Sequence, residues 1–428
     1  MSAITHQAIS RRSAANLFDA AHNIGATAFS APIHGSRPDA DWGLADPAPV
    51  TRRGSNLDSE GKVSPDMSTE DNGVELTDGP VKTADNVLLD LIRGTIGSHD
   101  ATADGPARID VQTPSGAMRL YLDGPTSGPA VLFLHGFPEI AYSWRHQFQF
   151  LAQEGYRVIA PDLPGTGASD YHGDDSAYTS LAIVEAIACC LDALGLTRVH
   201  IVGHDWGARH AWAFARERPQ RAMSVFTVNG PWQPRSARRP LSMVPQDRFS
   251  FLAFLASPSA NRILDEDPAR TLRFFLGHLY GTPDAAEVGR LHTGLSKAED
   301  PFGQAAFGCL PPWLSETELH MYVSAFQRTG FGPSLARYRN MDDDWAREPA
   351  WRPQLPCSAL IGQRDPAMLF KLYEPMLNSL DHCELVGIVP NAGHSLPSER
   401  PAQVNSELLA FLRRIGHTRP ESGPPGFL

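Results

Sequence analysis

The hydrophobic positions of residues 107–416 fall into short continuous runs that are separated by longer amphipathic stretches. A continuous apolar run of about five residues is typical of a parallel strand buried on both faces. Strands that alternate with helices predict a doubly wound α/β sheet with helices on both faces. The expected strands are Ala130–Leu134, Tyr156–Ala160, the apolar residues before Gly203, Met223–Val228, Cys357–Ile361 and Cys383–Val389, and the expected helices are Ser180–Leu194, Ala208–Arg216 and Ala402–Ile415.

The pattern changes at the start of this region and again in its middle. Alternating residues in Ala107–Leu122, around Pro114-Ser-Gly, predict a hairpin that opens the sheet. Residues 232–350 are helical, aromatic and interrupted by prolines, which predicts a helical cap inserted after a core strand. The α/β core is therefore expected at residues 105–231 and 351–416, followed by a loose tail at 417–428.

Residues 1–104 are rich in Ser, Ala, Gly, Asp and Pro and have no sustained apolar periodicity. Such a segment buries too little apolar surface to offset its ordering entropy, so we expect an extension that is mostly disordered, with Val87–Ile92 as a short docking helix. The first thirty residues contain two basic residues, Arg11 and Arg12, and one acidic residue, Asp19. This composition is weakly similar to that of an organellar transit peptide. A solvated tail on a cytoplasmic protein is the favoured interpretation.

Charge and cysteine content exclude several classes of partner. The net charge is −11, from 37 Lys and Arg against 48 Asp and Glu, which argues against nucleic acid or an anionic membrane surface as the main partner. The five cysteines have no metal-ligand spacing and suit a reducing compartment, so no metal is expected. No apolar run approaches the roughly 18 residues of a membrane span. The oligomeric state stays open.

The pentad Gly203-His204-Asp205-Trp206-Gly207 joins an expected strand directly to an expected helix. Its spacing is that of a nucleophile elbow, in which small residues flank a strained central residue at the carboxyl edge of a parallel sheet. A carboxylate that attacks a saturated carbon leaves an ester, which water can cleave, whereas a serine would leave an ether. Asp205 therefore favours substrates such as epoxides or alkyl halides. The alternative is that Asp205 merely caps the helix.

Three further positions complete a catalytic arrangement. Asp365 and His394 each follow an expected strand at the same sheet edge, in the chain order nucleophile, acid, His. His394 can activate water, while Asp365 can orient the ring and stabilise the imidazolium. The loop His135-Gly-Phe-Pro-Glu139 could present the Phe137 amide towards the elbow, where it would form an oxyanion hole with the Trp206 amide.

These motifs in combination resemble the soluble epoxide hydrolases of the α/β-hydrolase superfamily, over roughly residues 107–416. The resemblance implies that Tyr338 donates a hydrogen bond to the epoxide oxygen, and that an epoxide and water react to a vicinal diol without a cofactor. The matching stretches are His135-Gly-Phe-Pro-Glu139, Tyr142-Ser-Trp-Arg145, Gly203–Gly207, Phe331-Gly-Pro with Arg337-Tyr-Arg-Asn340, and Asn391-Ala-Gly-His394.

One position departs from the family pattern, which has two lid tyrosines. The first falls at Phe251, which cannot donate a hydrogen bond. Either the register of this match is shifted, or His278 or Tyr280 substitutes, or Tyr338 acts alone. We count Phe251, Trp206, His278 and Tyr280 as candidate substrate-pocket residues.

Two other functions compete with epoxide hydrolysis. A haloalkane or haloacetate dehalogenase could use the same Asp-His-Asp triad, with Trp206 holding the halide. Gly-His-Asp-Trp-Gly also occurs in dehalogenases, but many of them place Asn at the position of Phe137. The third possibility, a binding protein on the same fold, would not require all three groups of the triad.

Overall fold

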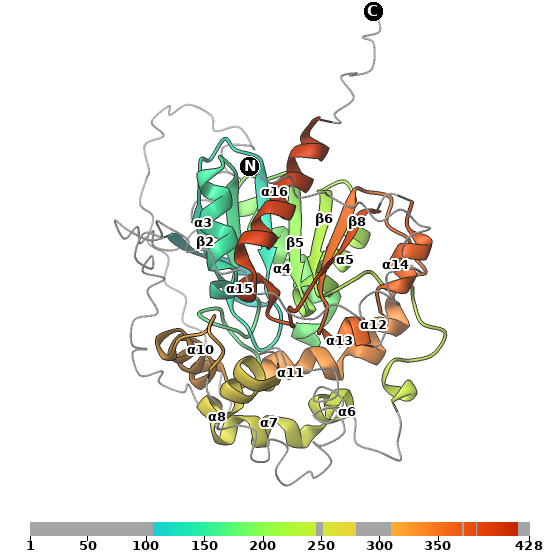
Figure 1. Ribbon diagram of the computed structural model, residues 1–428. Coiled ribbons are helices and arrows are strands. Elements are labelled where there is room, and N and C mark those ends of the chain that lie inside the picture. The colour runs from blue at the N-terminus through green and yellow to red at the C-terminus, as the bar shows by residue number, and fades with distance from the viewer. Residues whose placement is uncertain (1–105, 245–250, 280–309, 370–371, 382, 418–428) are drawn as a thin grey trace, which may run out of the picture.

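The computed structural model describes residues 106–244, 251–279, 310–369, 372–381 and 383–417 (Figure 1). The predicted disordered extension at 1–104, with its docking helix at Val87–Ile92, lies outside these residues, as does nearly all of the predicted tail. The site and the core elements that position it lie within them.

The core of the molecule is an eight-stranded sheet with the order β1-β2-β4-β3-β5-β6-β7-β8. Strands β1 and β2 form an antiparallel hairpin that pairs antiparallel with β4, and every other pairing is parallel. The α/β fold with a mostly parallel sheet is thus confirmed. The strands are β1 Ala107–Thr113, β2 Gly116–Asp123, β3 Ala130–Leu134, β4 Arg157–Pro161, β5 Val199–His204, β6 Ala222–Val228, β7 Cys357–Gly362 and β8 Cys383–Val389.

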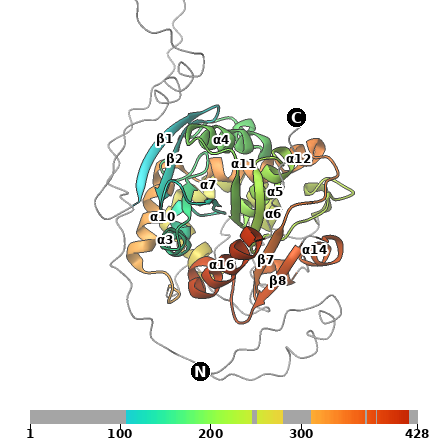
Figure 2. The same cartoon turned by 90° about the horizontal axis from the view of Figure 1, so that it is seen from above.

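Helices cover both faces of this sheet, as Figure 2 shows from above. Helices α3 and α16 pack together on one face, and α4 and α5 pack together on the other. Strands β3 and β5 lie between these layers and are buried along their whole length, which explains the continuous apolar sequence of β3. The core helices are α3 Arg145–Gln153, α4 Ser180–Ala193, α5 Trp206–Glu217, α13 Pro366–Leu369, α14 Glu374–Ser379, α15 Leu396–Glu399 and α16 Pro401–His417, with short turns η1 Ala141–Trp144 and η2 Asp175–Tyr178.

All the described elements between β6 and β7 are helices or helical turns, and they lie below the sheet in Figure 1. Several start with recognisable signals. For example, Ser315 and Glu318 form a reciprocal capping box at the start of α10. The elements of this cap are η3 Leu241–Met243, α6 Phe251–Ala256, α7 Pro258–Glu266, α8 Pro268–Leu272, η4 Arg273–Leu279, α10 Glu316–Thr329, α11 Gly332–Arg339 and α12 Met341–Arg347.

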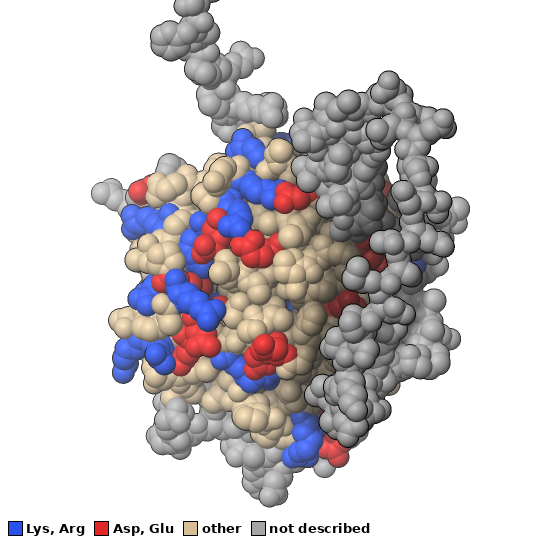
Figure 3. Space-filling model, turned by 180° about the vertical axis from the view of Figure 1, so that it is seen from behind, with Lys and Arg blue, Asp and Glu red and all other residues tan. Residues whose placement is uncertain are grey.

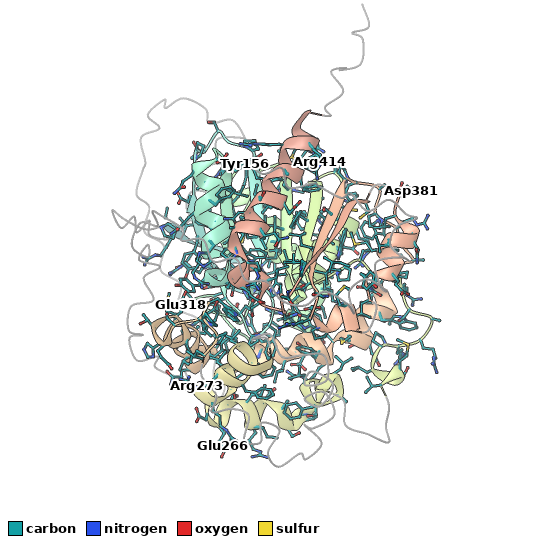
Figure 4. The ribbon with its side chains drawn as sticks, viewed as in Figure 1. Tyr156, Glu266, Arg273, Glu318, Asp381 and Arg414 are labelled. Atoms are coloured by element: carbon teal, nitrogen blue, oxygen red, sulfur yellow. The ribbon has the colours of Figure 1, made fainter. Side chains whose placement is uncertain are left out.

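Buried polar contacts join the cap to the core. The Arg145 guanidinium of α3 lies 2.6 Å from the Glu318 carboxylate of α10, and Figure 4 shows Glu318 at the side of the cap that faces the core. Farther along the interface, the Ser180 hydroxyl donates a 2.7 Å hydrogen bond to Asp344 of α12. These contacts hold the cap against the carboxyl ends of the strands, where the candidate catalytic residues lie.

The described surface gives no sign of a membrane span or a metal centre. No described helix is both long and apolar enough to cross a bilayer. Within the described ranges, no three His, Cys, Asp or Glu side chains group in a way that could hold a metal ion. Basic and acidic side chains are intermixed on the face seen from behind (Figure 3).

Candidate active site

The turn between β5 and α5 places Asp205 at the carboxyl edge of the sheet. Asp205 has a φ of 51° and a ψ of −120°, a backbone conformation that is costly for a residue with a Cβ. Gly203 and Gly207 make the turn possible, because a Cβ on Gly207 would lie 2.0 Å from the Leu134 carbonyl oxygen. Helix α5 begins at Trp206, two residues earlier than the sequence predicted, because the chain turns into the helix directly at the elbow.

The Asp205 side chain is directed into the site and does not cap the helix. Asp205 occupies the N-cap position of α5, but its carboxylate makes no capping hydrogen bond. Instead, Oδ1 accepts a 2.9 Å hydrogen bond from the Phe137 amide, and Oδ2 lies 3.4 Å from Nε2 of His394. The side chain keeps 21% of its surface exposed, which is what an attacking group requires. Capping alone therefore does not account for an aspartate here.

His394 lies between two carboxylates. Its Nδ1 hydrogen-bonds Oδ2 of Asp365, and its Nε2 faces Asp205. Asp365 is 1% exposed. It follows β7 and His394 follows β8, so the two side chains lie at the ends of neighbouring strands. The three residues predicted from separate parts of the sequence are thus brought together at one edge of the sheet.

The charges of these groups shift one another's pKa values. Burial opposes the charged form of His394, but Asp365 and Asp205 together raise its pKa to about 10. Burial also opposes ionisation of Asp205, but the hydrogen bond and charge of His394, with a smaller contribution from the Trp206 amide, lower its pKa below the usual range. At neutral pH the His394 ring is therefore an imidazolium.

Tyr338 of α11 lies on the cap side of the candidate site, next to Phe137 and Trp206. Its ring makes edge-to-face contacts with Trp206, at a centroid distance of 4.9 Å, and with Phe137, at 5.6 Å. Burial, followed by the charge of Asp205, raises the pKa of Tyr338 well above its usual value. The hydroxyl therefore keeps its proton at neutral pH and can donate it.

Three other residues were predicted to line the substrate pocket, Phe251, His278 and Tyr280. Helix α6 begins at Phe251 and packs against α11, so Phe251 belongs to an element adjoining that of Tyr338. The side chains of Phe251 and His278, and the whole of Tyr280, lie outside the described part of the chain. That His278 or Tyr280 supplies a second donor stays a prediction.

Sequence reasoning missed two residues that hold the site together. His204 donates a 2.8 Å hydrogen bond from Nδ1 to Glu139, and its Nε2 lies 2.8 Å from the His394 carbonyl oxygen. Glu139 also accepts a 2.7 Å hydrogen bond from the Gly136 amide, next to Phe137. Both residues stand inside quoted motifs, but nothing in their spacing, 65 positions apart, links them.

Asn229 is a third residue that sequence reasoning missed. Its Nδ2 donates a 2.6 Å hydrogen bond to the His394 carbonyl, and its Oδ1 accepts a 2.8 Å hydrogen bond from the Gly362 amide. The residue follows β6 and has a φ of 52°. A polar residue with positive φ just after a buried strand is the signal that could have identified it.

Comparisons with known proteins agree with this geometry. The α/β-hydrolase fold family matches residues 129–401. Epoxide hydrolase A of Mycobacterium tuberculosis is 33% identical over 319 residues, which are 72% of this chain and 97% of the relative. Epoxide hydrolase 3 of Siraitia grosvenorii is 31% identical over 309 residues, which are 70% of this chain and 96% of the relative.

Solved structures give the same result. The crystal structure of epoxide hydrolase A from Mycobacterium thermoresistibile superimposes with a TM-score of 0.66 at 36% identity, covering 72% of this chain and 98% of that one. An epoxide hydrolase from an endophytic Streptomyces gives a TM-score of 0.68 at 32% identity, covering 73% and 97%. Together with the fold, these similarities show that the protein is a hydrolase. The chain belongs to the α/β-hydrolase fold family and, within it, to the epoxide hydrolases.

Proposed function

We propose that the protein converts an epoxide and water to a vicinal diol through a covalent ester on Asp205. The observation that carries this proposal is the environment of the Asp205 carboxylate. One oxygen is bound by the Phe137 amide at 2.9 Å, and the other faces His394 at 3.4 Å. An oxygen bound by an amide suits the polarised carbonyl of an ester, and the oxygen that faces His394 suits the one that carries the substrate carbon.

In the first step, Oδ2 of Asp205 attacks an epoxide carbon and the carbon–oxygen bond of the ring breaks. Tyr338 donates its proton to the departing oxygen, and its contact with Trp206 keeps it above the nucleophile. The product of this step is a hydroxyalkyl ester of Asp205 and a Tyr338 phenolate.

In the second step, water attacks Cγ of the ester. Ester formation removes the charge of Asp205, so the pKa of His394 falls from its raised resting value. The imidazolium passes its Nε2 proton through solvent to the Tyr338 phenolate, and the neutral ring can then accept a proton from water. The Phe137 and Trp206 amides stabilise the negative oxygen of the tetrahedral intermediate. Its collapse releases the diol, which takes one water proton through His394, while the other water proton passes from the Asp205 carboxyl to His394 and restores the resting imidazolium.

Water labelled with oxygen-18 tests this sequence of steps. One turnover should place the label in the Asp205 carboxylate, because the oxygen of water enters at Cγ, and peptide mass spectrometry would detect it. Label in the diol after the first turnover, with none in the protein, would mean direct attack of water on the epoxide. An assay of aryl and aliphatic epoxides beside haloalkanes separates epoxide hydrolysis from dehalogenation.

A further inference from the structure

A pocket of about 150 Å³ adjoins Asp205 on the outer side of α5. It lies where the chain leaves the core after β6 and where it returns before β7, and both connecting segments contribute to its wall. Asp205, the proposed nucleophile, is among the residues of the wall. The catalytic steps proposed above make no use of the side chains that line its remainder.

Basic and aromatic side chains dominate this wall. Three arginines line the pocket, Arg209, Arg216 and Arg235, against the single glutamate Glu348, with Asp205 at the inner end. The same wall contains Trp212 and Trp232, which are 7% and 5% exposed. Aromatic faces beside guanidinium groups suit a flat ring that carries a negative charge.

Arg209 is only partly neutralised by its neighbours. It lies 3.5 Å from Glu348, which exceeds the roughly 2.8 Å of a strong charge-assisted hydrogen bond, whereas Arg216 pairs with Glu217 at 2.7 Å and also lies 3.3 Å from Glu348. Nε of Arg209 is buried and has no hydrogen-bond acceptor among the described residues. An anion entering the pocket would therefore find donors that Glu348 does not saturate.

The spacing along α5 relates these charges to the reacting atoms. Asp205, Arg209, Trp212 and Arg216 are three or four residues apart and so follow one face of the helix. Arg209 lies one turn, about 6 Å, beyond Asp205, and helical side chains lean back towards the N-terminus. The guanidinium carbon of Arg209 lies 5.6 Å from the centre of the Trp206 ring, so the Arg209 side chain extends towards the N-terminal end of α5.

We propose that this pocket is a subsite for an anionic group of the substrate. The inference rests on the proposed role of Asp205 and names a substrate class for it: epoxides with a carboxylate on a compact aryl group beside the oxirane. A cavity of this volume accommodates one benzene ring. A carboxylate at the far side of such a ring lies about one helical turn from the reacting carbon, beside Arg209. The arginines also offset the repulsion between that carboxylate and Asp205.

The first test compares 4-(oxiran-2-yl)benzoate with its methyl ester, which has the same ring and oxirane but no charge. The kcat/KM of the wild type should favour the acid by about tenfold or more at low ionic strength, and added salt should reduce the preference. Arg209→Met should lower the acid-to-ester ratio about tenfold, whereas Arg209→Lys should retain part of it. Arg218→Met, at the far end of α5 and outside the pocket, should leave the ratio unchanged.

The second test measures binding without turnover. Calorimetric titration with 4-ethylbenzoate, which has no oxirane, should give a Kd that Arg209→Met weakens about tenfold. Equal Kd values for wild type and Arg209→Met, or no binding to either, would overturn the subsite. An acid-to-ester ratio near one in the wild type would also overturn it while leaving epoxide hydrolysis intact. If neither epoxide reacts but Arg209→Met weakens 4-ethylbenzoate binding, the subsite holds and the proposed reaction fails.

Discussion

His204 donates a 2.8 Å hydrogen bond to Glu139 beneath the active site. The other ring nitrogen of His204 lies 2.8 Å from the His394 carbonyl oxygen, so both nitrogens have acceptors as partners. Burial opposes ionisation of Glu139, but His204 beside it lowers the pKa of that carboxyl below the usual value. This buried contact ties the loop that carries Phe137 to the loop that carries His394.

We expect Glu139→Gln to lower the free energy of unfolding by about 3 kcal/mol, because it removes a buried carboxylate that accepts hydrogen bonds from both His204 and the Gly136 amide. Glu154→Gln is the matched control, since Glu154 pairs with Arg413 on the surface at 2.7 Å, and such pairs contribute about 1 kcal/mol or less. Urea unfolding, monitored by circular dichroism, measures the free energy of unfolding of the two variants. Equal losses in the two variants would mean that the His204–Glu139 pair is no stronger than a surface contact.

His394→Gln should trap the ester on Asp205. Attack on the epoxide needs Asp205 and Tyr338, but hydrolysis of the ester needs a group that takes a proton from water. Intact-mass measurement after addition of an epoxide should therefore show an adduct of the substrate's mass. Asp205→Asn is the control and should give none. Steady turnover by His394→Gln without an adduct would exclude His394 as the base.

The raised pKa of His394 makes stability depend on pH. Its folded value of about 10 exceeds an unfolded value of about 6.5, so the protonated ring stabilises the native state. This contribution is complete below about pH 6.5 and is lost as the pH rises through about 10. The Tm difference between wild type and His394→Gln should therefore shrink from pH 6 to pH 10, by thermal unfolding. A difference that stays constant would show that the two carboxylates do not raise this pKa.

Tyr338→Phe should slow epoxide opening by about a hundredfold or more, because an alkoxide leaving group needs a proton. Release of bromide from an alkyl bromide needs none, so any such activity should change little. The measurement is kcat/KM for one epoxide and one alkyl bromide in both proteins. Unchanged epoxide turnover in Tyr338→Phe would remove Tyr338 from the mechanism, and bromide release without any epoxide opening would favour a dehalogenase.

Phe251→Tyr complements that variant. Helix α6 adjoins α11, so a tyrosine at its first residue is expected to add a second donor and to leave epoxide turnover equal or faster. In the double variant Tyr338→Phe, Phe251→Tyr, partial recovery of epoxide opening would support this register. A loss of activity in Phe251→Tyr alone, with unchanged Tm, would contradict it.

Much of the architecture was predictable from local sequence. The continuous apolar run of β3 and the strand-to-helix turn around Asp205 have patterns that few other structures can adopt. Predicted and observed core elements agree to within a few residues, because strand burial and helix periodicity are short-range properties. The order of Asp205, Asp365 and His394 after three strands was also sufficient to predict that they meet at one edge of the sheet.

What the sequence alone could not determine depends on contacts between distant segments. The pairing of Glu139 with His204 and the pocket between α5 and the two cap connections both arise when loops far apart in the chain are packed together. The number of residues between two charged side chains does not reveal whether they pair, because the loops between paired groups have no fixed length. The sequence by itself determined the fold and which three residues, Asp205, Asp365 and His394, meet at the candidate site. Only the tertiary structure decided which charges are buried beside it, since burial follows from packing.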